Sequence, residues 1–175
     1  VQCNFCDETD DPQSRLIAAK VADVQVVCVY VPNGQTPSSE KYQYKLLWIK
    51  RLRAWLDRHF SPDQPLVICG DFNIAPQEID AAFPEQWRES VLFNDEIRQV
   101  LKQEVLSWGM ADLFREKNPD VQAYSWWDYR MLGFPKGDGL RIDLILGTPP
   151  MLQRCTSVEI DRNERKGKLP SDHAP

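Results

Sequence analysis

Several features are scarce in this sequence of 175 residues. No apolar run approaches the roughly 18 residues that a membrane-spanning helix needs, and no charged stretch followed by an apolar one opens the chain. Repetitive tracts are also lacking, and 42% hydrophobic with 27% charged residues favours a folded chain over a disordered one. We therefore expect a soluble, cytoplasmic protein without a membrane partner, folded as a single domain over residues 1–175.

Cysteines are few and odd in number, and the five of them argue against a disulfide framework. Cys28 and Cys69 lie in apolar, strand-like runs, so we expect both to be buried free thiols. Cys3 and Cys6 form a single C-x-x-C pair. A structural zinc site takes about four ligands, so this pair alone does not predict one.

An excess of positive charge is missing as well. The net charge of −5 lacks the basic footprint of most nucleic-acid-binding proteins. It does not exclude such a partner, because enzymes that hold a cation against a phosphate concentrate carboxylates at the site. Lys and Arg do cluster in residues 45–58 and 162–168, and the first cluster is expected on the solvated face of a helix.

Strand-like and helix-like segments alternate along the chain. Residues 15–31 predict two strands joined by a tight connection, and apolar residues recur at helical spacing over residues 40–60. Residues 66–69 form a short apolar run typical of a strand buried on both faces. Further helices are expected at 94–108 and 111–117, and further short strands at 124–127, 141–146 and 156–160. This order indicates a layered α/β fold.

Two polar residues follow the apolar run at 66–69. Asp71 supplies a carboxylate that can orient or deprotonate a water, or ligate a hard cation. Asn73 offers a donor and an acceptor, which suits placing that water against a phosphate oxygen. Strand ends are where α/β folds hold such groups, although Gly-Asp-x-Asn is also a common turn pattern.

Asp143 and His173 form a second candidate pair. Asp143 is a charged residue in an otherwise apolar strand-like run, which is costly unless it is paired. His173, one of only two histidines, follows Asp172 in a polar turn. Pairing with Asp143 would hold the imidazole in one tautomer and favour its charged form near a phosphate.

Longer motifs follow one another along the chain. In order they are Tyr30-Val31-Pro32-Asn33-Gly34, Gly70-Asp71-Phe72-Asn73-Ile74-Ala75-Pro76, Leu106-Ser107-Trp108-Gly109-Met110-Ala111-Asp112, Ser125-Trp126-Trp127-Asp128-Tyr129-Arg130, Gly139-Leu140-Arg141-Ile142-Asp143 and Ser171-Asp172-His173-Ala174-Pro175. They resemble the successive motifs of exonuclease III, the abasic-site endonuclease branch of the endonuclease/exonuclease/phosphatase superfamily. The Gly-Asp-x-Asn and Ser-Asp-His pieces mark the superfamily, and the fourth and fifth motifs are specific to the repair branch.

The resemblance implies catalytic roles for five residues. Asp71 would activate or orient the attacking water, and Asn73 would help to place it and the phosphate. Asp143 would orient His173, which would contact the scissile phosphate. Tyr30 would donate a hydrogen bond near the same phosphate.

Further roles concern metal and substrate. Asp172 would contribute to metal binding, together with Asp71, and Asn33 would assist near the phosphate. Trp126 and Leu140 occupy the positions that in this family wall the pocket for a flipped-out abasic sugar. Such a pocket makes physical sense, because a sugar without its base can enter where a full nucleotide would clash.

The resemblance also implies a fold. It is the C-terminal portion of a four-layer α/β sandwich, in which two packed β-sheets are flanked by helices and part of one sheet is missing. The family pattern starts upstream of Val1, with an early Asn and a metal-binding Glu, and continues past Pro175. We therefore expect a domain incomplete at both ends and inactive in isolation, with an exposed sheet face that favours self-association.

The implied function is base-excision repair. The protein would hydrolyse the DNA backbone 5′ to abasic sites or trim 3′ ends, using Mg²⁺ or alternatively Mn²⁺. Its partner would be double-stranded DNA with abasic or 3′-blocked sites, and in a bacterium it would associate with the nucleoid. Two alternatives stay open: a superfamily phosphatase acting on lipid or inositol phosphates, and a non-catalytic nucleic-acid-binding remnant.

Overall fold

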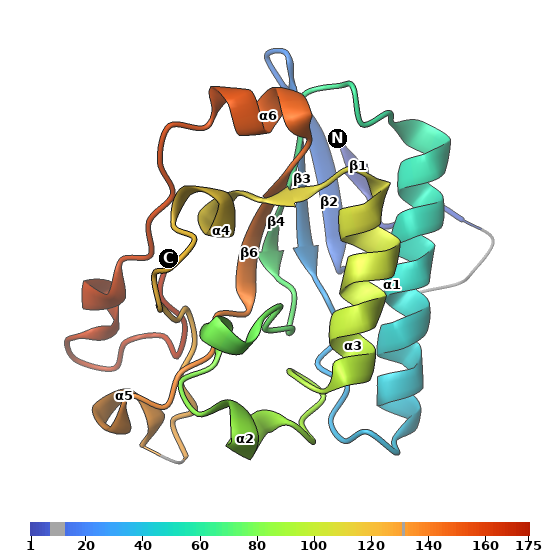
Figure 1. Cartoon of the computed structure of the whole chain (residues 1–175). Coiled ribbons are helices and arrows are strands. Elements are labelled where there is room, and N and C mark those ends of the chain that lie inside the picture. Colours follow the sequence, from blue (N-terminus) through green and yellow to red (C-terminus); the bar gives the residue numbers. More distant parts are fainter. Residues whose placement is uncertain (8–12, 131) are drawn as a thin grey trace.

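The computed structural model describes residues 1–7, 13–130 and 132–175. These residues form a six-stranded sheet with the strand order β1-β2-β3-β4-β6-β5, and the long helix packs on one side of it (Figure 1). The strands are β1 (Gln2–Cys3), β2 (Leu16–Val21), β3 (Val24–Tyr30), β4 (Leu66–Asp71), β5 (Ala111–Asp112) and β6 (Asp143–Gly147). The expected α/β class is confirmed, and within the described part of the chain the strands belong to one sheet rather than two.

The sheet is mixed. β2 and β3 form an antiparallel hairpin, as expected from residues 15–31, and β3 runs parallel to β4. A parallel pair needs a long crossover, and here that crossover contains α1. β6 then pairs antiparallel with β4 on one side and with β5 on the other. The ends of β3 and β4 therefore lie beside the start of β6.

The helices differ in length and type. The α-helices are α1 (Glu40–His59), α2 (Pro84–Trp87), α3 (Asp95–Val100), α4 (Leu113–Lys117), α5 (Gly133–Lys136) and α6 (Pro149–Arg154). Three short 3₁₀ helices are η1 (Glu78–Asp80), η3 (Leu106–Trp108) and η4 (Arg162–Arg165), and η2 (Leu101–Val105) is a π-helix. The helix expected at 94–108 is thus confirmed, but it changes from α through π to 3₁₀ along its length. None of the described helices is long and apolar enough to cross a membrane.

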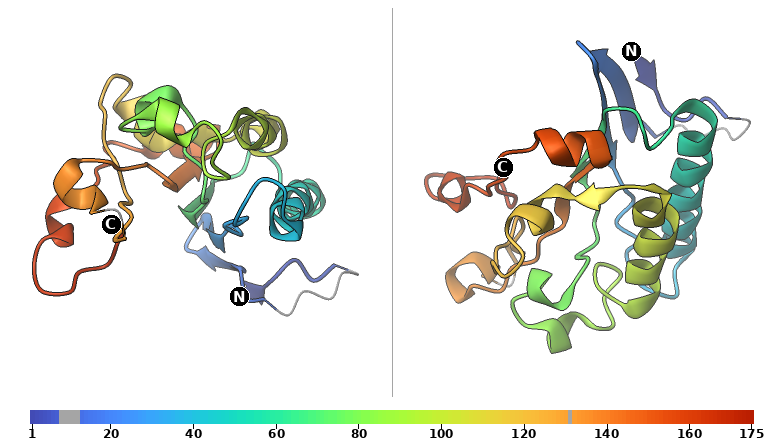
Figure 2. Two further views of the ribbon diagram at one scale, coloured as in Figure 1. Left: turned by 90° about the horizontal axis from the view of Figure 1, so that it is seen from below. Right: turned by 45° about the horizontal axis from the view of Figure 1, so that its top comes forward.

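The helix α1 is the longest element, and its start follows from the sequence. Ser39 caps it, since the Ser39 side chain accepts a hydrogen bond from the backbone N–H of Tyr42. The apolar face of α1 includes Trp48, Leu52 and Trp55, all of which are buried. α1 and α3 lie side by side, as the views in Figure 1 and Figure 2 show.

One face of the sheet packs into the hydrophobic core. Alternate residues of each central strand point to this face, as the two-residue period of a strand requires. They pack against α1, η2 and the segments that join them in a single cluster. The sheet residues of this cluster are Leu16, Ala18, Val27, Val29, Leu66, Ile68, Leu144 and Leu146.

The opposite face of the sheet is open. A cross-strand row on this face runs through Ile17, Cys28, Cys69 and Ile145, which are neighbours in the strand register. Ile17 is 48% exposed and Ile145 is 39% exposed. The prediction of two buried thiols is therefore wrong, because Cys28 is exposed and Cys69 only half-buried. β4 is accordingly buried on one face and not on both.

Two of the predicted short strands are not formed as expected. Trp126 makes only isolated bridges, to Leu140 and His173, so 124–127 is not a continuous strand. The segment 156–160 forms no strand, although it lies across a small cavity of about 200 Å³ from β6. β5 pairs with β6 only at Leu146 and Gly147, and the segment 156–160 lies across the cavity from the rest of β6 without pairing to it.

Candidate active site at the ends of three strands

Three polar residues lie side by side where the central strands meet. Tyr30 at the end of β3 is in register with Asp71 at the end of β4, and Asp71 is in register with Asp143 at the start of β6. Residues in register on adjacent strands point to the same face, so all three side chains lie on the open face, two residues beyond the Cys28 row. The sequence placed these residues 41 and 72 positions apart, and the sheet brings them together.

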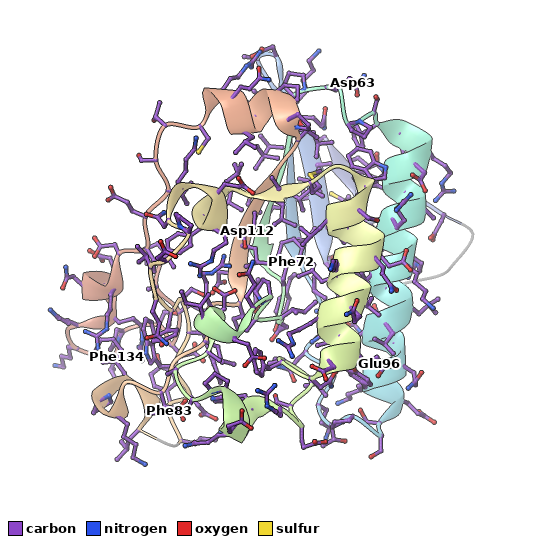
Figure 3. All side chains as sticks on the ribbon, viewed as in Figure 1. Asp63, Phe72, Phe83, Glu96, Asp112 and Phe134 are labelled. Atoms are coloured by element: carbon purple, nitrogen blue, oxygen red, sulfur yellow. The ribbon has the colours of Figure 1, made fainter. Side chains whose placement is uncertain are left out.

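The Asp71 carboxylate is held by Asn73. Asp71 Oδ1 accepts a hydrogen bond from the backbone N–H of Asn73 at 2.8 Å, and Asp71 Oδ2 accepts one from Asn73 Nδ2 at 3.0 Å. Between them, Phe72 turns into the core, where it is fully buried (Figure 3). In the Gly-Asp-x-Asn turn, the side chain of Phe72 therefore packs into the core, and the polar side chains of Asp71 and Asn73 are bonded to each other.

Asn73 is fixed by further contacts. Its Nδ2 also donates to the carbonyl oxygen of Val31 at 3.0 Å, and its Oδ1 accepts from Asn33 Nδ2 at 3.0 Å. Its backbone lies in the left-handed region with φ of 51°, which asparagine tolerates better than most residues. Asn33 and Asn73, predicted separately, thus form one hydrogen-bonded pair that leads to Asp71.

Asp71 is an unusually weak acid. Burial, followed by the negative charge of Asp143, raises its pKa to about 6. The backbone N–H of Asn73 and the nearby positive charges act in the opposite direction. A carboxylate with a pKa close to neutral can both accept and return a proton near physiological pH.

Asp143 and His173 form the predicted pair. His173 Nδ1 lies 2.8 Å from Asp143 Oδ2. Burial lowers the pKa of His173, but the hydrogen bond and charge of Asp143, with smaller contributions from Asp71 and Asp172, outweigh it and raise the pKa above its ordinary value. The imidazole therefore favours its charged form, with Nδ1 directed at the carboxylate.

The segment that carries His173 is held by the chain around Trp126. Trp126 Nε1 donates to Asp172 Oδ2 at 3.0 Å, and the backbone N–H of Trp127 donates to the Asp172 carbonyl oxygen at 3.1 Å. Trp126 and His173 also form an isolated β-bridge. These contacts place Asp172 next to His173 on the same side of the site.

Trp126 and Leu140 come together as well. The backbone of Leu140 bridges both Trp126 and Ala81, and the ring of Trp87 packs edge-on against Trp126 at 5.9 Å between centroids. Trp126 is half-buried, whereas Leu140 is fully buried. Trp126 and Leu140 are adjacent in the structure. That they line a pocket for an abasic sugar stays a prediction.

Residues that the sequence did not single out support the site. Ser125 Oγ accepts hydrogen bonds from the backbone N–H groups of Ile142 and Asp143, both at 3.0 Å, and so fixes the start of β6. In the sequence, nothing about Ser125 before Trp126 and Trp127 indicates that it accepts hydrogen bonds from the start of β6. Its position is set only when residues 125 and 143 are packed together.

A buried arginine–aspartate network, formed by Asp80, Asp112, Arg115 and Arg141, lies behind the site. Arg141 is fully buried, and its guanidinium reaches Asp80 Oδ1 at 2.7 Å and Asp112 Oδ2 at 2.6 Å. Arg115 adds a 2.6 Å contact to Asp80 Oδ1. Arg141 is the neighbour of Leu140 in the chain, so this network determines where the start of β6 lies.

Lys45 is the largest departure from expectation. It belongs to the basic cluster at 45–58 and was expected on the solvated face of α1, but that prediction is wrong because Lys45 is fully buried. A signal was present in the sequence: Lys45 stands three residues after Tyr42 and three before Trp48, on the apolar face of the helix.

The metal ligands expected from the sequence are Asp71 and Asp172. Among residues 1–7, 13–130 and 132–175, no group of three or more His, Cys, Asp and Glu side chains is arranged to hold a metal ion. Mg²⁺ at phosphoryl-transfer sites is usually bound through one or two carboxylates, with water and substrate phosphate supplying the rest. Two carboxylates do not form an all-protein cage, and a cation held by them would need water or other oxygens for its remaining ligands.

Comparisons with known proteins agree with this geometry. The sequence profile described as Endonuclease/Exonuclease/phosphatase family matches residues 6–173. Exodeoxyribonuclease III of Haemophilus influenzae is 31% identical over 186 residues, covering 100% of this chain and 70% of that protein.

Two solved structures share the fold. An AP endonuclease from Archaeoglobus fulgidus superposes with a TM-score of 0.87 at 39% identity, covering 91% of this chain and 62% of its own. The 3′ phosphatase NExo from Neisseria, bound to a product DNA hairpin, superposes with a TM-score of 0.88 at 40% identity, covering 94% and 64%. The chain thus spans 62% to 70% of the length of these three proteins.

Proposed function

This chain belongs to the Endonuclease/Exonuclease/phosphatase family, and from that membership and its site we propose that it is an exonuclease III-type DNA phosphodiesterase that depends on a divalent metal ion. The observation that carries the proposal is the row of Tyr30, Asp71 and Asp143 across three neighbouring strands, completed by His173. Hydrolysis of a phosphodiester needs a base for water and a cationic group for the phosphate, and this row offers both.

Asp71 is the proposed base. Its pKa of about 6 leaves it ionised at neutral pH, yet basic enough to take a proton from a water that attacks phosphorus. Asn73 holds the Asp71 carboxylate from two sides and so fixes the direction in which its free lone pairs point. Tyr30, at 51% exposure beside Asp71, is free to donate its hydroxyl to a phosphate oxygen.

His173 is the proposed phosphate-binding cation. Asp143 keeps it charged and fixes Nδ1, which leaves Nε2 as the donor for a phosphate oxygen on which negative charge develops. Asn33, exposed and bonded to Asn73, adds a nearby polar group for the same phosphate.

We assign Asp172, with Asp71, as the protein ligands of the metal ion. Mg²⁺, or Mn²⁺ in its place, would neutralise charge on the phosphate when bound there. The Trp126 indole holds one oxygen of Asp172 and leaves the other available to the cation.

The proposed substrate is double-stranded DNA with abasic or 3′-blocked sites. Two of the similar proteins are named for abasic-site incision and for 3′ phosphate removal, and one of them is bound to a DNA hairpin. Trp126 and Leu140 are the proposed walls of the pocket that receives the abasic sugar.

Cleavage assays on labelled duplexes test the proposal. The purified protein is given a duplex with one abasic analogue, the same duplex undamaged, a duplex with a 3′ phosphate, and inositol phosphates, each with Mg²⁺ or with EDTA. Because residues 1–175 span only 62% to 70% of the similar proteins, we expect the natural full-length protein to incise 5′ to the abasic site or to remove the 3′ group, and EDTA to abolish this cleavage. Residues 1–175 alone are expected to be inactive. Release of phosphate from the inositol compounds alone would support a phosphatase instead.

An Asp71→Asn variant separates a catalyst from a binding protein. We expect it to lose activity by roughly 10²-fold to 10⁴-fold, the usual contribution of a general base, while DNA binding is kept. The matched control is Asp63→Asn, an exposed aspartate beyond the opposite end of β4 (Figure 3), which should cleave like the wild type. DNA binding without cleavage in the full-length wild type would identify a non-catalytic remnant.

We also propose that the open face of the sheet mediates self-association. Its exposed apolar side chains, such as Ile17 and Ile145, form the kind of patch that associates in water. Light scattering should detect a concentration-dependent dimer in the wild type and a monomer in the Ile145→Lys variant. A wild type that is monomeric at all concentrations would refute this.

A further inference from the structure

The side chain of Lys45 lies beneath the candidate site, fully buried on the inner face of α1. An ammonium group in the protein interior is very costly unless its donors are all used. Burial lowers the pKa of Lys45 to about 7, and only the charge of Asp71 acts in the opposite direction. A leucine or methionine would fill the same space without that cost, so the amine needs a reason to be there.

All three donors of the amine are used. Lys45 Nζ donates to the carbonyl oxygens of Asn73 at 2.7 Å, Val91 at 2.7 Å and Asn33 at 3.1 Å. An ammonium group has three N–H donors and no acceptor, so the match is complete. The three carbonyls belong to separate segments: the loop after β3, the turn after β4, and the segment before α3.

Two of these three carbonyls belong to residues of the site. Asn33 and Asn73 are bonded to each other through their side chains, and Asn73 holds both oxygens of Asp71. Lys45 therefore fixes the backbone of the residues whose side chains orient the proposed base. Without it, the left-handed backbone of Asn73 would lose the hydrogen bond that holds its carbonyl.

The loop after β3 passes closely over the side chain of Lys45. Gly34 has φ of 99°, and a Cβ atom added there would lie 3.2 Å from Cδ of Lys45 and 3.2 Å from the ring of Tyr42. Glycine thus allows the loop to pass closely over the lysine stem. The close packing and the three hydrogen bonds constrain the same loop from two sides.

We propose that Lys45 is a positioning residue for the proposed phosphodiesterase reaction: from beneath the site, its ammonium group holds Asn33 and Asn73 so that Asn73 keeps Asp71 in the orientation for catalysis. This inference rests on the proposed function. Lys45 touches neither substrate nor reacting atoms, since it is fully buried and all its donors point to backbone carbonyls.

The direct test observes the asparagine side chains, and it does not require activity. In protein labelled with ¹⁵N-asparagine, the side-chain NH₂ signal of Asn73 should be protected from exchange in the wild type, because three partners hold that amide. In Lys45→Met we expect its exchange to speed up by about tenfold or more through local opening. The matched control is Leu52→Ala, on the same buried face of α1 and remote from the three carbonyls, which should leave that signal protected although it weakens the core.

Kinetics provide a second measurement. In Lys45→Met, kcat should fall by about a hundredfold with KM within about threefold, because a small misplacement of catalytic groups lowers the rate of the chemical step. Leu52→Ala should keep the wild-type kcat per folded molecule. If Lys45→Met does not fold, Lys45→Gln replaces it: its amide has two donors and should give a smaller change in the same direction in both measurements.

The outcomes separate the inference from the function on which it rests. An unchanged Asn73 signal in a folded Lys45 variant, or an unchanged kcat in an active background, would overturn the positioning role. A full-length wild type without cleavage of any duplex would overturn the proposed function, and the exchange of Asn73 would still decide whether Lys45 fixes that residue.

Discussion

Two clusters of charge, one buried and one half-buried, lie close together in this protein and are built in opposite ways. In the arginine–aspartate network, Arg141 stands between Asp80 and Asp112, and its pKa is raised because those carboxylates outweigh the effect of burial. In the candidate site, Asp71 stands beside another carboxylate, Asp143, and its pKa is raised to about 6. One cluster is neutralised internally, whereas the other keeps an uncompensated negative charge.

The difference separates structural support from chemistry. A buried carboxylate that is fully paired is a poor base, because its lone pairs are occupied and its charge is stabilised. A carboxylate crowded by a like charge costs stability, but it is ready to accept a proton or a cation. The network sets the position of β6, and the site uses the charge that β6 and β4 bring together.

Breaking the arginine–aspartate network should have the largest effect on stability. Arg141→Met removes the cation and leaves Asp80 and Asp112 buried without it, which typically costs about 3 to 5 kcal/mol of unfolding free energy. Urea denaturation measures the change. The control is Arg88→Met, an exposed arginine with two carboxylate partners, which should not change stability measurably. Equal stability of the two variants would refute the structural role of the network.

Removing the negative charge of Asp71 should stabilise the protein. The folded-state pKa of Asp71 is above its unfolded value of 3.8, so between those values the folded state binds more protons and stability falls as pH rises through about 6. Asp71→Asn removes this penalty. We expect it to be more stable than the wild type by up to about 3 kcal/mol at pH 7.5 without metal, since the two pKa values differ by about two units and one unit corresponds to about 1.4 kcal/mol.

The same comparison at pH 4 sharpens that prediction. Near pH 4 the Asp71 carboxyl is largely protonated in the folded state, so the advantage of Asp71→Asn should shrink. Thermal unfolding in EDTA at both pH values is the measurement. A variant that is less stable than the wild type at pH 7.5 would show that Asp71 is a structural group like those of the network.

Separating His173 from Asp143 should have the smallest effect on stability. The folded-state pKa of His173 is raised, so its pairing stabilises the protein below the unfolded pKa and this contribution is lost as pH rises through the folded value. Asp143→Asn should therefore lower the pKa of His173, measured by NMR titration without metal. It should also destabilise the protein more at pH 5.5 than at pH 8.5, and a His173 pKa that does not move would contradict the pairing.

The sequence by itself indicated much of the site. Asp71 and Asn73 follow an apolar run, and Asp143 is a charged residue in an apolar strand, which is costly unless it is paired. The Asp143 to His173 pair was predicted and is confirmed at 2.8 Å. α1 was predicted almost to its ends, because a helix of this length shows its period in the positions of its apolar residues.

Only the tertiary structure decided the rest. Cys28 and Cys69 lie in apolar strands, yet they are not buried, because local pattern shows which residues share a face and not whether another layer covers it. The segment 156–160 has a strand-like pattern, but a small cavity separates it from β6 and it forms no strand. Strand pairing and face coverage depend on partners that are distant in the sequence.

The burial of Lys45 has the same origin. A lysine within a basic segment is usually solvated, and only the arrival of three carbonyls, from the segments at Asn33, Asn73 and Val91, makes an interior position tolerable. The sequence thus indicated which residues are proposed to carry the chemistry, through local patterns and through the family resemblance. The tertiary structure determined which groups hold them in place, because those hydrogen bonds join residues 12 to 46 positions apart.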